Sequence, residues 1–408
     1  MNKFEPNHII AHIDMNSYFA SVEQQARPAL RNRPVAVTGP SKRTVVVAAS
    51  VEAKYFGIKT GTQIAEAKKL YPNIVLIKSD CRRYESISAQ LINIFSRFTP
   101  TIEIFSIDEA FLDLTNIAQN LSQAAKIVNQ IKKCITKEIG TNIKCSAGIA
   151  NNKFIAKLAS EAKKPDGLIV VPQGKEIDFL DQFELSDACG IGKKSVKHLN
   201  RLNIYSFKDL RSVNQAALTL IFKSYGLKLY HMARGIDNSP IFPYYLSGKP
   251  KSISRSKTFP QDIYDEDYIK RVGLFFCCDI ASELKKQNLL ASSLGLYLRF
   301  SDFSFAGGGA AIKSPTALST DLFFYFKKNL EKSPICKPIR KVGVWAGELI
   351  TDNGQTALLK DFDKKLRLEK TAENINKKFA RNIVTPASLA GLNLEQSPSY
   401  GFQKRFIN

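Results

Sequence analysis

The first part of the chain alternates short apolar runs with longer segments in which apolar residues recur every three or four positions. Short runs rich in Ile and Val predict buried strands, and the 3.6-residue period predicts helices. Strands are expected at 8–14, 73–78, 143–150 and 167–172, with a hairpin at 103–114. Helices are expected at 16–27, 64–71, 84–98, 118–138 and 152–164, and 45–58 reads as a strand that gives way to a helix.

Three larger regions follow from this pattern. Segments 8–16 and 74–172 have a βαββαβ-like order, which predicts an antiparallel sheet with helices on one face. Residues 173–234 read as helices with short connections, and residues 235–254 carry three prolines and two glycines, as expected of a linker. Residues 251–350 return to mixed α and β, with alternating strands at 294–300 and 342–350, before a charged helix at 361–381. The fold class is therefore α+β, with several domains.

Composition narrows the class of protein. A length of 408 residues suggests two to four domains, and 44% apolar with 24% charged residues is ordinary for a globular chain. Seven cysteines without CxxC spacing and only four histidines favour reduced thiols in a cytoplasmic protein over zinc sites or disulfides. No run of eighteen apolar residues occurs and the opening residues are polar, so we expect neither a membrane span nor a signal peptide.

The chain carries a large excess of positive charge. Lys and Arg number 59 against 37 Asp and Glu, a formal net charge of +22. Residues 186–260 alone hold 13 basic and 3 acidic residues, 13 − 3 = +10. Nucleic acid is the leading partner that such charge predicts, with an anionic membrane surface as its rival.

Three carboxylates stand out because they interrupt apolar, strand-like sequence. Asp14 ends the run HIIAHID, and Asp108 with Glu109 interrupts FSIDEAFLDL. The plain alternative for this pair is a hairpin turn, but no Gly, Asn or Pro occurs between 101 and 115 to favour one. Three acids at one point repel each other unless a cation lies among them, and such a group predicts a two-metal phosphoryl-transfer site.

The strings IDMNSYFASVE at 13–23 and FSIDEAFLDL at 105–114, in this order and separation, resemble the Y-family translesion DNA polymerases of the DinB (DNA polymerase IV) type. The resemblance extends over residues 8 to about 350. It implies a template-directed, DNA-dependent DNA polymerase of low fidelity that acts in translesion synthesis and DNA repair. It also implies a right-hand architecture: palm 1–19 and 75–172, fingers 20–74, thumb 173–234, linker 235–250, little finger 251–350 and tail 351–408.

The resemblance implies a set of metal ligands. Asp14, Asp108, Glu109 and the backbone carbonyl of Met15 match the positions that hold two Mg²⁺ ions, for which Mn²⁺ can substitute. One departure lies between them. The family usually reads Asp-x-Asp in the first string, whereas this chain has Asn16 at the second position.

The resemblance also implies a nucleotide pocket. Tyr18 and Phe19 match the aromatic pair beside the sugar, and Phe19 occupies the position of the steric gate that excludes ribonucleotides. Lys54 and Lys164 match the positions that contact the triphosphate. Here too the chain departs from DinB, because Val51 and Lys54 replace a common Tyr and Arg, and a missing Tyr is a feature that some UmuC-like members share.

Three further segments are candidates for macromolecular contacts. Gly190, Gly192, Lys193 and Lys194 lie in a Gly-x-Gly turn before an amphipathic helix, which predicts a helix-hairpin-helix that binds DNA phosphates. By resemblance, Lys251, Arg255 and Lys257 lie on a little-finger strand along the DNA backbone. QTALL at 355–359 resembles the peptide that docks to the sliding clamp, with Gln355, Leu358 and Leu359 as its anchors. The expected partners are primer-template DNA, dNTP and the clamp, bound by a monomer.

Two other functions are compatible with part of this pattern. A relative that binds DNA but has lost its chemistry would not need the three acids. A metal-dependent repair nuclease with a helix-hairpin-helix would not need the aromatic pair or the paired lysines. Primer extension, no change, or primer shortening distinguishes the three.

Overall fold

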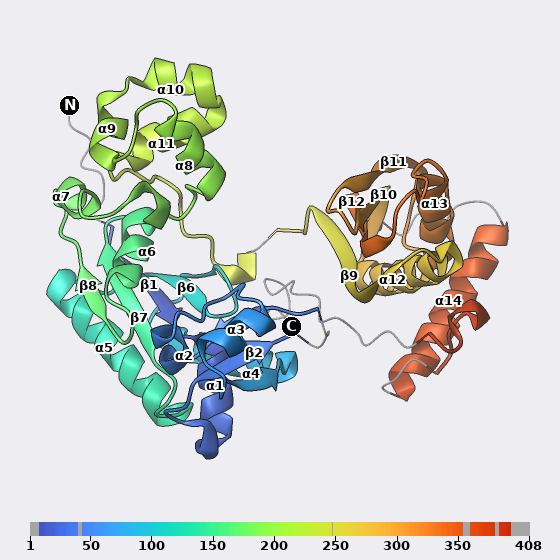
Figure 1. Ribbon diagram of the computed structural model, residues 1–408, viewed down its shortest axis with the longest axis horizontal. Helices are drawn as coiled ribbons and strands as arrows, with labels where there is room; N and C mark the ends of the chain where they lie inside the picture. Colours follow the sequence, from blue (N-terminus) through green and yellow to red (C-terminus); the bar gives the residue numbers. More distant parts are fainter. Residues whose placement is uncertain (1–7, 40–42, 247, 354–359, 380–382, 393–408) are drawn as a thin grey trace. The chain divides into compact units, whose positions relative to one another are not determined.

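The computed structural model describes residues 8–39, 43–246, 248–353, 360–379 and 383–392. Most residues up to Ser247 form one compact unit, and residues from Gly248 onwards form a second. The first unit holds two sheets and a group of helices, and the second holds one sheet with its helices (Figure 1).

The larger sheet of the first unit has the strand order β5-β6-β1-β7-β8. Its strands are β1 (Ile10–Met15), β5 (Ile102–Ile104), β6 (Glu109–Asp113), β7 (Cys145–Ala150) and β8 (Leu168–Val170). The central strand β1 pairs antiparallel with both β6 and β7, as expected, but β8 pairs parallel with β7. The expected all-antiparallel sheet is therefore wrong at one edge, because helix α6 (Lys153–Ala162) carries the chain back across the sheet before β8.

Helices cover both faces of this sheet, whereas the sequence predicted one. Residues of α1 (Tyr18–Ala26), α4 (Cys81–Phe95) and α5 (Leu121–Glu138) share one core with Ala11 and Ile13 of β1. Helix α6 packs on the other face, where it shares a core with Ile10 and Phe111. Gly148 permits this approach, since a Cβ atom there would overlap the backbone of α6 at Ala156.

The smaller sheet has the order β3-β2-β4. It consists of β2 (Val35–Thr38), β3 (Val46–Ala49) and β4 (Val75–Lys78), with α2 (Val51–Tyr55) and α3 (Ile64–Leu70) alongside. The sequence grouped 74–78 with the larger sheet. The structure corrects this, because β4 pairs parallel with β2, a strand that the sequence pattern did not reveal.

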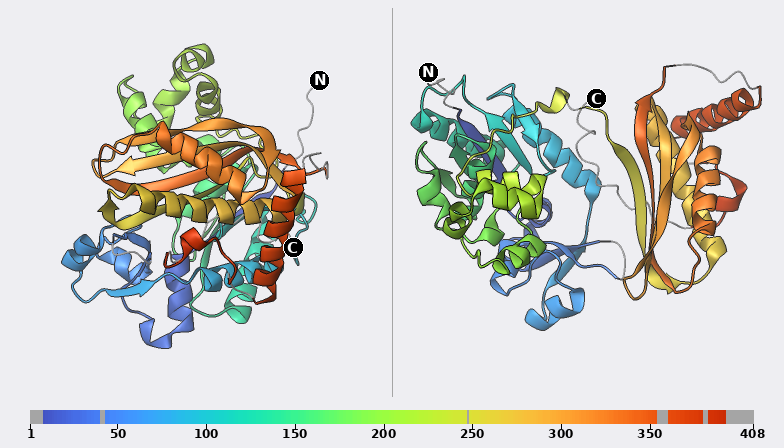
Figure 2. Two further views of the ribbon diagram at one scale, coloured as in Figure 1. Left: turned by 90° about the vertical axis from the view of Figure 1, so that its right-hand side faces the viewer. Right: turned by 90° about the horizontal axis from the view of Figure 1, so that it is seen from above.

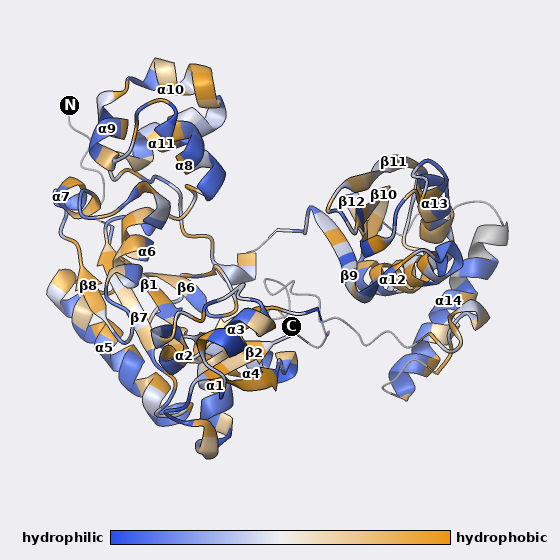
Figure 3. Ribbon diagram, in the orientation of Figure 1, coloured by the Kyte–Doolittle hydropathy of each residue, from blue (hydrophilic) through white to orange (hydrophobic). Residues whose placement is uncertain are grey.

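Five helices follow β8, in agreement with the predicted helical region. They are α7 (Glu176–Leu180), α8 (Lys193–Asn200), α9 (Phe207–Ser212), α10 (Gln215–Phe222) and α11 (Ser224–Met232). Their core includes Leu199, Phe207 and Leu229. Most residues of helix α8 are hydrophilic (Figure 3).

The second unit is built on an antiparallel sheet of order β11-β10-β12-β9. Its strands are β9 (Ser252–Ile263), β10 (Leu289–Phe300), β11 (Phe305–Thr316) and β12 (Ile339–Thr351). Helices α12 (Glu266–Lys286) and α13 (Ser319–Glu331) lie on one side of the sheet (Figure 2). Helix α14 (Lys360–Lys378) forms ion pairs with α12, in which Glu369 and Glu373 contact Lys285. Within the described ranges, no helix has the length and apolarity needed to span a membrane.

Candidate active site

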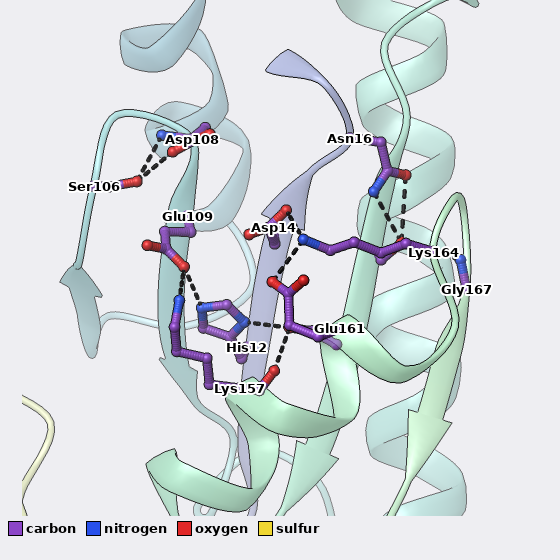
Figure 4. Close-up of polar contacts among 12 residues, drawn as sticks. His12, Asp14, Asn16, Ser106, Asp108, Glu109, Lys157, Glu161, Lys164 and Gly167 are labelled. Atoms are coloured by element: carbon purple, nitrogen blue, oxygen red, sulfur yellow. Dashed lines mark hydrogen bonds and ion pairs between the residues drawn. The ribbon is translucent and has the colours of Figure 1, made fainter. Parts of the chain in front are cut away.

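The register of the larger sheet brings the predicted acids together. Asp14 of β1 lies directly opposite Glu109 of β6. Asp108 immediately precedes β6, and its carbonyl accepts a hydrogen bond of 2.9 Å from the backbone N–H of Met15. The ends of both strands therefore meet at one edge (Figure 4). Asp14 and Glu109 also share the sheet face that α6 covers, since the alternate residues Ile13 and Ala110 belong to the opposite core.

Glu109 is held by a layer of residues that the sequence analysis missed. The Nε2–H of His12 donates to Glu109 Oε2 over 3.1 Å, and Lys157 Nζ forms an ion pair with the same oxygen. The other ring nitrogen of His12 lies 2.8 Å from Ser160 Oγ. Burial alone would raise the pKa of Glu109, but the hydrogen bonds from His12 and Lys157 lower that pKa to about 2. Glu109 is thus a fixed anion, with Oε1 free of hydrogen bonds to the described residues.

Asp14 has a different partner. Lys164 Nζ lies 2.7 Å from Asp14 Oδ1 and 2.6 Å from Glu161 Oε1, so it bridges two carboxylates. Burial raises the pKa of Asp14 to about 6, although Lys164 opposes the shift. Lys54 of α2 is close enough to Lys164 and Asp14 for their charges to act on it. Burial and the positive charge of Lys164 lower the pKa of Lys54. The two lysines predicted for the triphosphate are therefore close to Asp14.

Asp108 has the weakest support of the three acids. Its carboxylate accepts a hydrogen bond from Ser106 Oγ and forms no ion pair with the described residues. Burial raises the pKa of Asp108, and the neighbouring charge of Glu109 adds to the shift. A cation beside Asp108 would relieve both effects.

The donor chemistry of the site fits magnesium. The candidate ligands are carboxylate oxygens and the Met15 carbonyl, which are the hard donors that Mg²⁺ prefers. Burial raises the pKa of Asp14 despite its ion pair with Lys164, and it raises the pKa of Asp108, which has no cation beside it among the described residues. Within the described ranges, no three His, Cys, Asp or Glu side chains already stand at the spacing of a metal cage, and lysines balance two of the acids.

Asn16 connects two parts of the site instead of joining the acids. Its side chain is 5% exposed, donates to Ser146 Oγ over 3.0 Å and accepts from the backbone N–H of Asp166 over 2.8 Å. These contacts tie the end of β1 to β7 and to the loop that carries Lys164. An Asp at position 16 would lack the donor for Ser146.

The two residues of the aromatic pair differ in burial. Tyr18 is 3% exposed, and its hydroxyl donates to the backbone carbonyl of Tyr84 over 2.7 Å. Phe19 is partly exposed and stacks on Tyr84 with 4.2 Å between ring centroids and 13° between ring planes. Tyr84 is in turn fixed by a hydrogen bond to the buried Glu23. Tyr18 therefore supports Tyr84 from the core, and Phe19 presents an oriented ring.

The predicted phosphate turn has the expected backbone form. Gly192 is the N-terminal cap of α8, and Gly190 has φ of 106°, which favours glycine. Lys193 and Lys194 occupy the first turn of α8, are exposed and have no ion-pair partner among the described residues. This end of α8 is open to an anion.

The predicted basic strand is divided between surface and interior. Lys251 is exposed just before β9. Arg255 and Lys257 lie opposite the buried residues Val344 and Val342, and Arg255 forms an ion pair with Asp279 of α12. Both side chains thus start from the helix-covered face of the sheet. The QTALL segment, with Gln355, Leu358 and Leu359, lies outside the described residues.

Known proteins resemble the chain over most of its length. The impB/mucB/samB family model matches residues 13–161, and the model of that family's C-terminal domain matches residues 250–358. Proteins named DNA polymerase IV are similar to it. The one from Desulfatibacillum aliphaticivorans is 33% identical over 93% of this chain and 96% of its own length. The one from Neisseria meningitidis is 33% identical over 86% and 98%.

A solved structure agrees with these sequence matches. A Y-family DNA polymerase chimera of Dbh and Dpo4 is 25% identical to the chain and superposes with a TM-score of 0.74. The similarity covers 84% of this chain and 99% of the chimera.

Proposed function

Because this chain belongs to the Y family of DNA polymerases, the impB/mucB/samB family, and is a DNA-directed DNA polymerase, we propose a two-metal mechanism in which Asp14, Asp108 and Glu109 are the catalytic carboxylates. The primer 3′-oxygen attacks the α-phosphorus of a dNTP, and pyrophosphate leaves. The observation that carries this assignment is the β1–β6 register, which pairs Asp14 with Glu109 and sets Asp108 beside them.

The three carboxylates and the Met15 carbonyl would hold the two Mg²⁺ ions. When bound, these ions would supply the charge that activates the 3′-hydroxyl and stabilises the departing pyrophosphate. His12 and Lys157 keep Glu109 ionised and hold Oε2, so that Oε1 is the oxygen presented to a ligand. Because the Glu109 carboxylate is already oriented, less free energy is needed to order this ligand when a metal ion binds.

Lys164 and Lys54 bind the triphosphate in this proposal. The Lys164 ammonium lies between Asp14 and Glu161, so a bound cation at Asp14 would release it toward an anionic ligand. Lys54 has no ion-pair partner among the described residues, and although part of it is buried beside Lys164, it keeps surface open to solvent. Lys54 on α2 and Lys164 in the loop after α6 are near enough for their charges to interact, and two such cations suit a polyanion better than a single phosphate.

Phe19 is the steric gate for the sugar. Its ring is oriented by Tyr84 and leaves no polar group to accept or donate toward a 2′-hydroxyl. A rigid apolar ring discriminates by exclusion, which adds a clash to the ribonucleotide rather than an attraction to the deoxyribonucleotide.

The arrangement of sheets and helices also suggests which parts of the protein contact DNA. We assign the larger sheet to the palm, the three-stranded sheet with α2 and α3 to the fingers, α7–α11 to the thumb, and the second unit to the little finger. Gly190, Gly192, Lys193 and Lys194 would contact the DNA backbone, as would Lys251. The small fingers support synthesis of low fidelity across damaged templates, by a cytoplasmic monomer that a sliding clamp can recruit.

Primer extension tests the proposal. Wild-type protein with primed template, dNTPs and Mg²⁺ should lengthen the primer, whereas Asp108→Asn should reduce the rate by roughly 10³-fold or more while it still binds DNA. Asp113→Asn, on the same strand but at its far end, is the matched control and should keep the rate. Shortened primers would indicate a nuclease, and an unchanged primer with tight binding would indicate a non-catalytic DNA-binding protein.

A further inference from the structure

The loop that carries Lys164 follows a tight path. It spans residues 163–167 and joins α6 to β8. Gly167 lies against the start of the loop, because a Cβ atom there would overlap the carbonyl oxygen of Lys163. Asp166 has φ of 57°, a left-handed conformation that residues other than glycine adopt rarely. Such a backbone needs contacts from outside the loop to stabilise it.

Asn16 and Ser146 hold this loop from the larger sheet. Asn16 Oδ1 accepts a hydrogen bond of 2.8 Å from the backbone N–H of Asp166. Ser146 Oγ accepts one of 3.3 Å from the backbone N–H of Gly167, and the Asn16 amide donates to the same oxygen over 3.0 Å. A carboxylate at position 16 could accept from Asp166 but could not donate to Ser146. Figure 4 shows Asn16 beside the segment that runs from Lys164 to Gly167.

Lys132 of α5 holds the same loop from a different element. Its Nζ donates to the carbonyl of Asp166 over 2.7 Å and to that of Gly167 over 3.3 Å. The same nitrogen lies 2.9 Å from Asp166 Oδ1. An ammonium group has three N–H donors, so these three acceptors use all of them. The side chain of Lys132 is 16% exposed and fully occupied, which suits a residue that supports the loop rather than one that binds a ligand.

We propose that Lys132 and Asn16 are positioning residues that set the affinity for dNTP through Lys164. They fix the backbone two and three residues after Lys164, so that its ammonium group starts from a defined point when it binds the triphosphate. Ordering a long side chain costs entropy, and a loop that is already ordered adds little to that cost. This inference rests on the proposed role of Lys164 and adds the residues outside the pocket on which that role depends.

The positioning should affect nucleotide binding more than the chemical step. Asp14 and Glu109 are held by the pairing of β1 with β6, to which this loop does not belong. Loss of the loop contacts leaves these carboxylates in place and displaces only Lys164. The KM for dNTP should therefore rise, and kcat should change little.

Lys132→Met tests the inference, because it removes all three contacts and keeps a side chain of similar length. We measure the Kd of dATP by calorimetry with Mg²⁺ and a dideoxy-terminated primer-template, on which no chemistry occurs. This Kd should rise roughly 5- to 20-fold, as expected for the loss of about one buried hydrogen-bonded group. Lys133→Met removes the same charge from the exposed neighbouring position of α5 and should bind dATP like wild type.

Asn16→Ala removes the contacts from the sheet without a change of charge, and it should raise the Kd of dATP in the same way. Asp166→Asn weakens only the ion pair with Lys132 and provides a milder variant that preserves the backbone. Hydrogen exchange of the metal-free protein is a readout that needs no nucleotide. The amides of residues 163–168 should exchange faster in Lys132→Met and Asn16→Ala, but not in Lys133→Met. Thermal unfolding verifies that each variant is folded.

A double-variant cycle shows whether Lys132 acts through Lys164. Lys164→Ala should raise the Kd of dATP by roughly 10- to 100-fold, the loss expected for one charged contact. Lys132→Met/Lys164→Ala should bind dATP no more weakly than Lys164→Ala alone, because no ammonium group remains to be positioned.

Three results would overturn the inference. Unchanged affinity in folded Lys132→Met and Asn16→Ala, with Lys164→Ala impaired, would show that Lys164 needs no such support. Additive losses in the double variant would mean that Lys132 acts on the nucleotide by its own charge, and so would an equal loss in Lys133→Met. Unchanged affinity in Lys164→Ala would refute the role of Lys164 itself, so failure of the proposed function and failure of this inference are distinguishable.

Discussion

The three catalytic candidates differ in what surrounds each carboxylate. Glu109 touches His12 and Lys157, Asp14 touches Lys164, and Asp108 touches no cation among the described residues. The site therefore holds one acid that is firmly ionised and one whose charge is poorly compensated. This difference predicts that removal of the Asp108 charge stabilises the metal-free protein, whereas removal of the Glu109 charge destabilises it.

Asp108→Asn should stabilise the metal-free protein. The raised pKa of Asp108 means that its charged form is less favourable in the folded than in the unfolded chain, so above both pKa values the carboxylate costs stability. A neutral amide of the same shape removes that cost. We expect calorimetry in EDTA to show a melting temperature higher by roughly 1–3 °C, against no rise for Asp113→Asn. A lower melting temperature would mean that the carboxylate stabilises the fold.

Phe19→Ala should admit ribonucleotides. The ring of Phe19 is fixed by stacking on Tyr84, so its removal opens space where the sugar edge would lie. The ratio of dNTP to rNTP incorporation, measured as kcat/KM on one template, should fall by about 10- to 100-fold. Tyr84→Phe keeps the stacked ring and loses only the bond to Glu23, so it should retain selectivity. Unchanged selectivity in Phe19→Ala would remove Phe19 from the gate.

Individual residues could be predicted only where a motif carried them. Asp14, Asp108 and Glu109 interrupt apolar runs and are visible in the sequence. His12 lies two residues before Asp14, hence on the same face of β1. Lys157 and Glu161 are four residues apart and lie on one side of α6, and Lys164 follows in the loop after this helix. These positions can be read from the sequence. The contacts among them depend on how α6 packs on β1, which the periodicity of the sequence does not predict.

At the scale of elements, the position of α6 decides the geometry of the site. This helix and the loop after it carry Lys157, Ser160 and Lys164, and α6 approaches the sheet closely because Gly148 has no side chain. Apolar runs predicted most strands of the larger sheet, but they revealed neither β2 nor β11. The parallel edge, the second helical face and the small sheet of β2 and β4 were not predicted, since they depend on pairing between segments distant in sequence.

Gly148→Ala should separate α6 from the sheet. The added methyl group would overlap the α6 backbone, which cannot move as a side chain can. We expect a loss of roughly 1–3 kcal/mol in the free energy of unfolding and a slower extension rate, as Lys157 moves away from Glu109. Urea unfolding and primer extension measure the two effects. Gly248→Ala, where a Cβ atom meets nothing within 4 Å, is the control expected to change neither. Equal stability of both variants would contradict this account of α6.

At the scale of the whole molecule, the dominant property is charge. The net +22 was readable from composition, and it correctly indicated a nucleic-acid partner, as membership of a DNA polymerase family confirms. The sequence did not reveal how basic residues are divided between surface and interior. Arg255 is paired with Asp279, whereas Lys193 and Lys194 have no described partner, so equal formal charges make unequal contributions to DNA binding.

Binding to primed template should therefore weaken steeply with salt, and α8 should account for a defined share of the effect. Each phosphate contact that a lysine makes releases counterions, so the slope of log K against log salt measures the number of contacts. The double variant Lys193→Ala/Lys194→Ala should make the slope less negative by about 1–2 and lower affinity at every template sequence alike. Lys175→Ala, whose ammonium already pairs with Asp178 at 3.0 Å, should leave the slope unchanged. Fluorescence anisotropy between 50 mM and 200 mM salt measures all three proteins. Should the double variant keep the wild-type slope, the turn before α8 does not contact the DNA backbone, and the charge that binds DNA lies elsewhere in the chain.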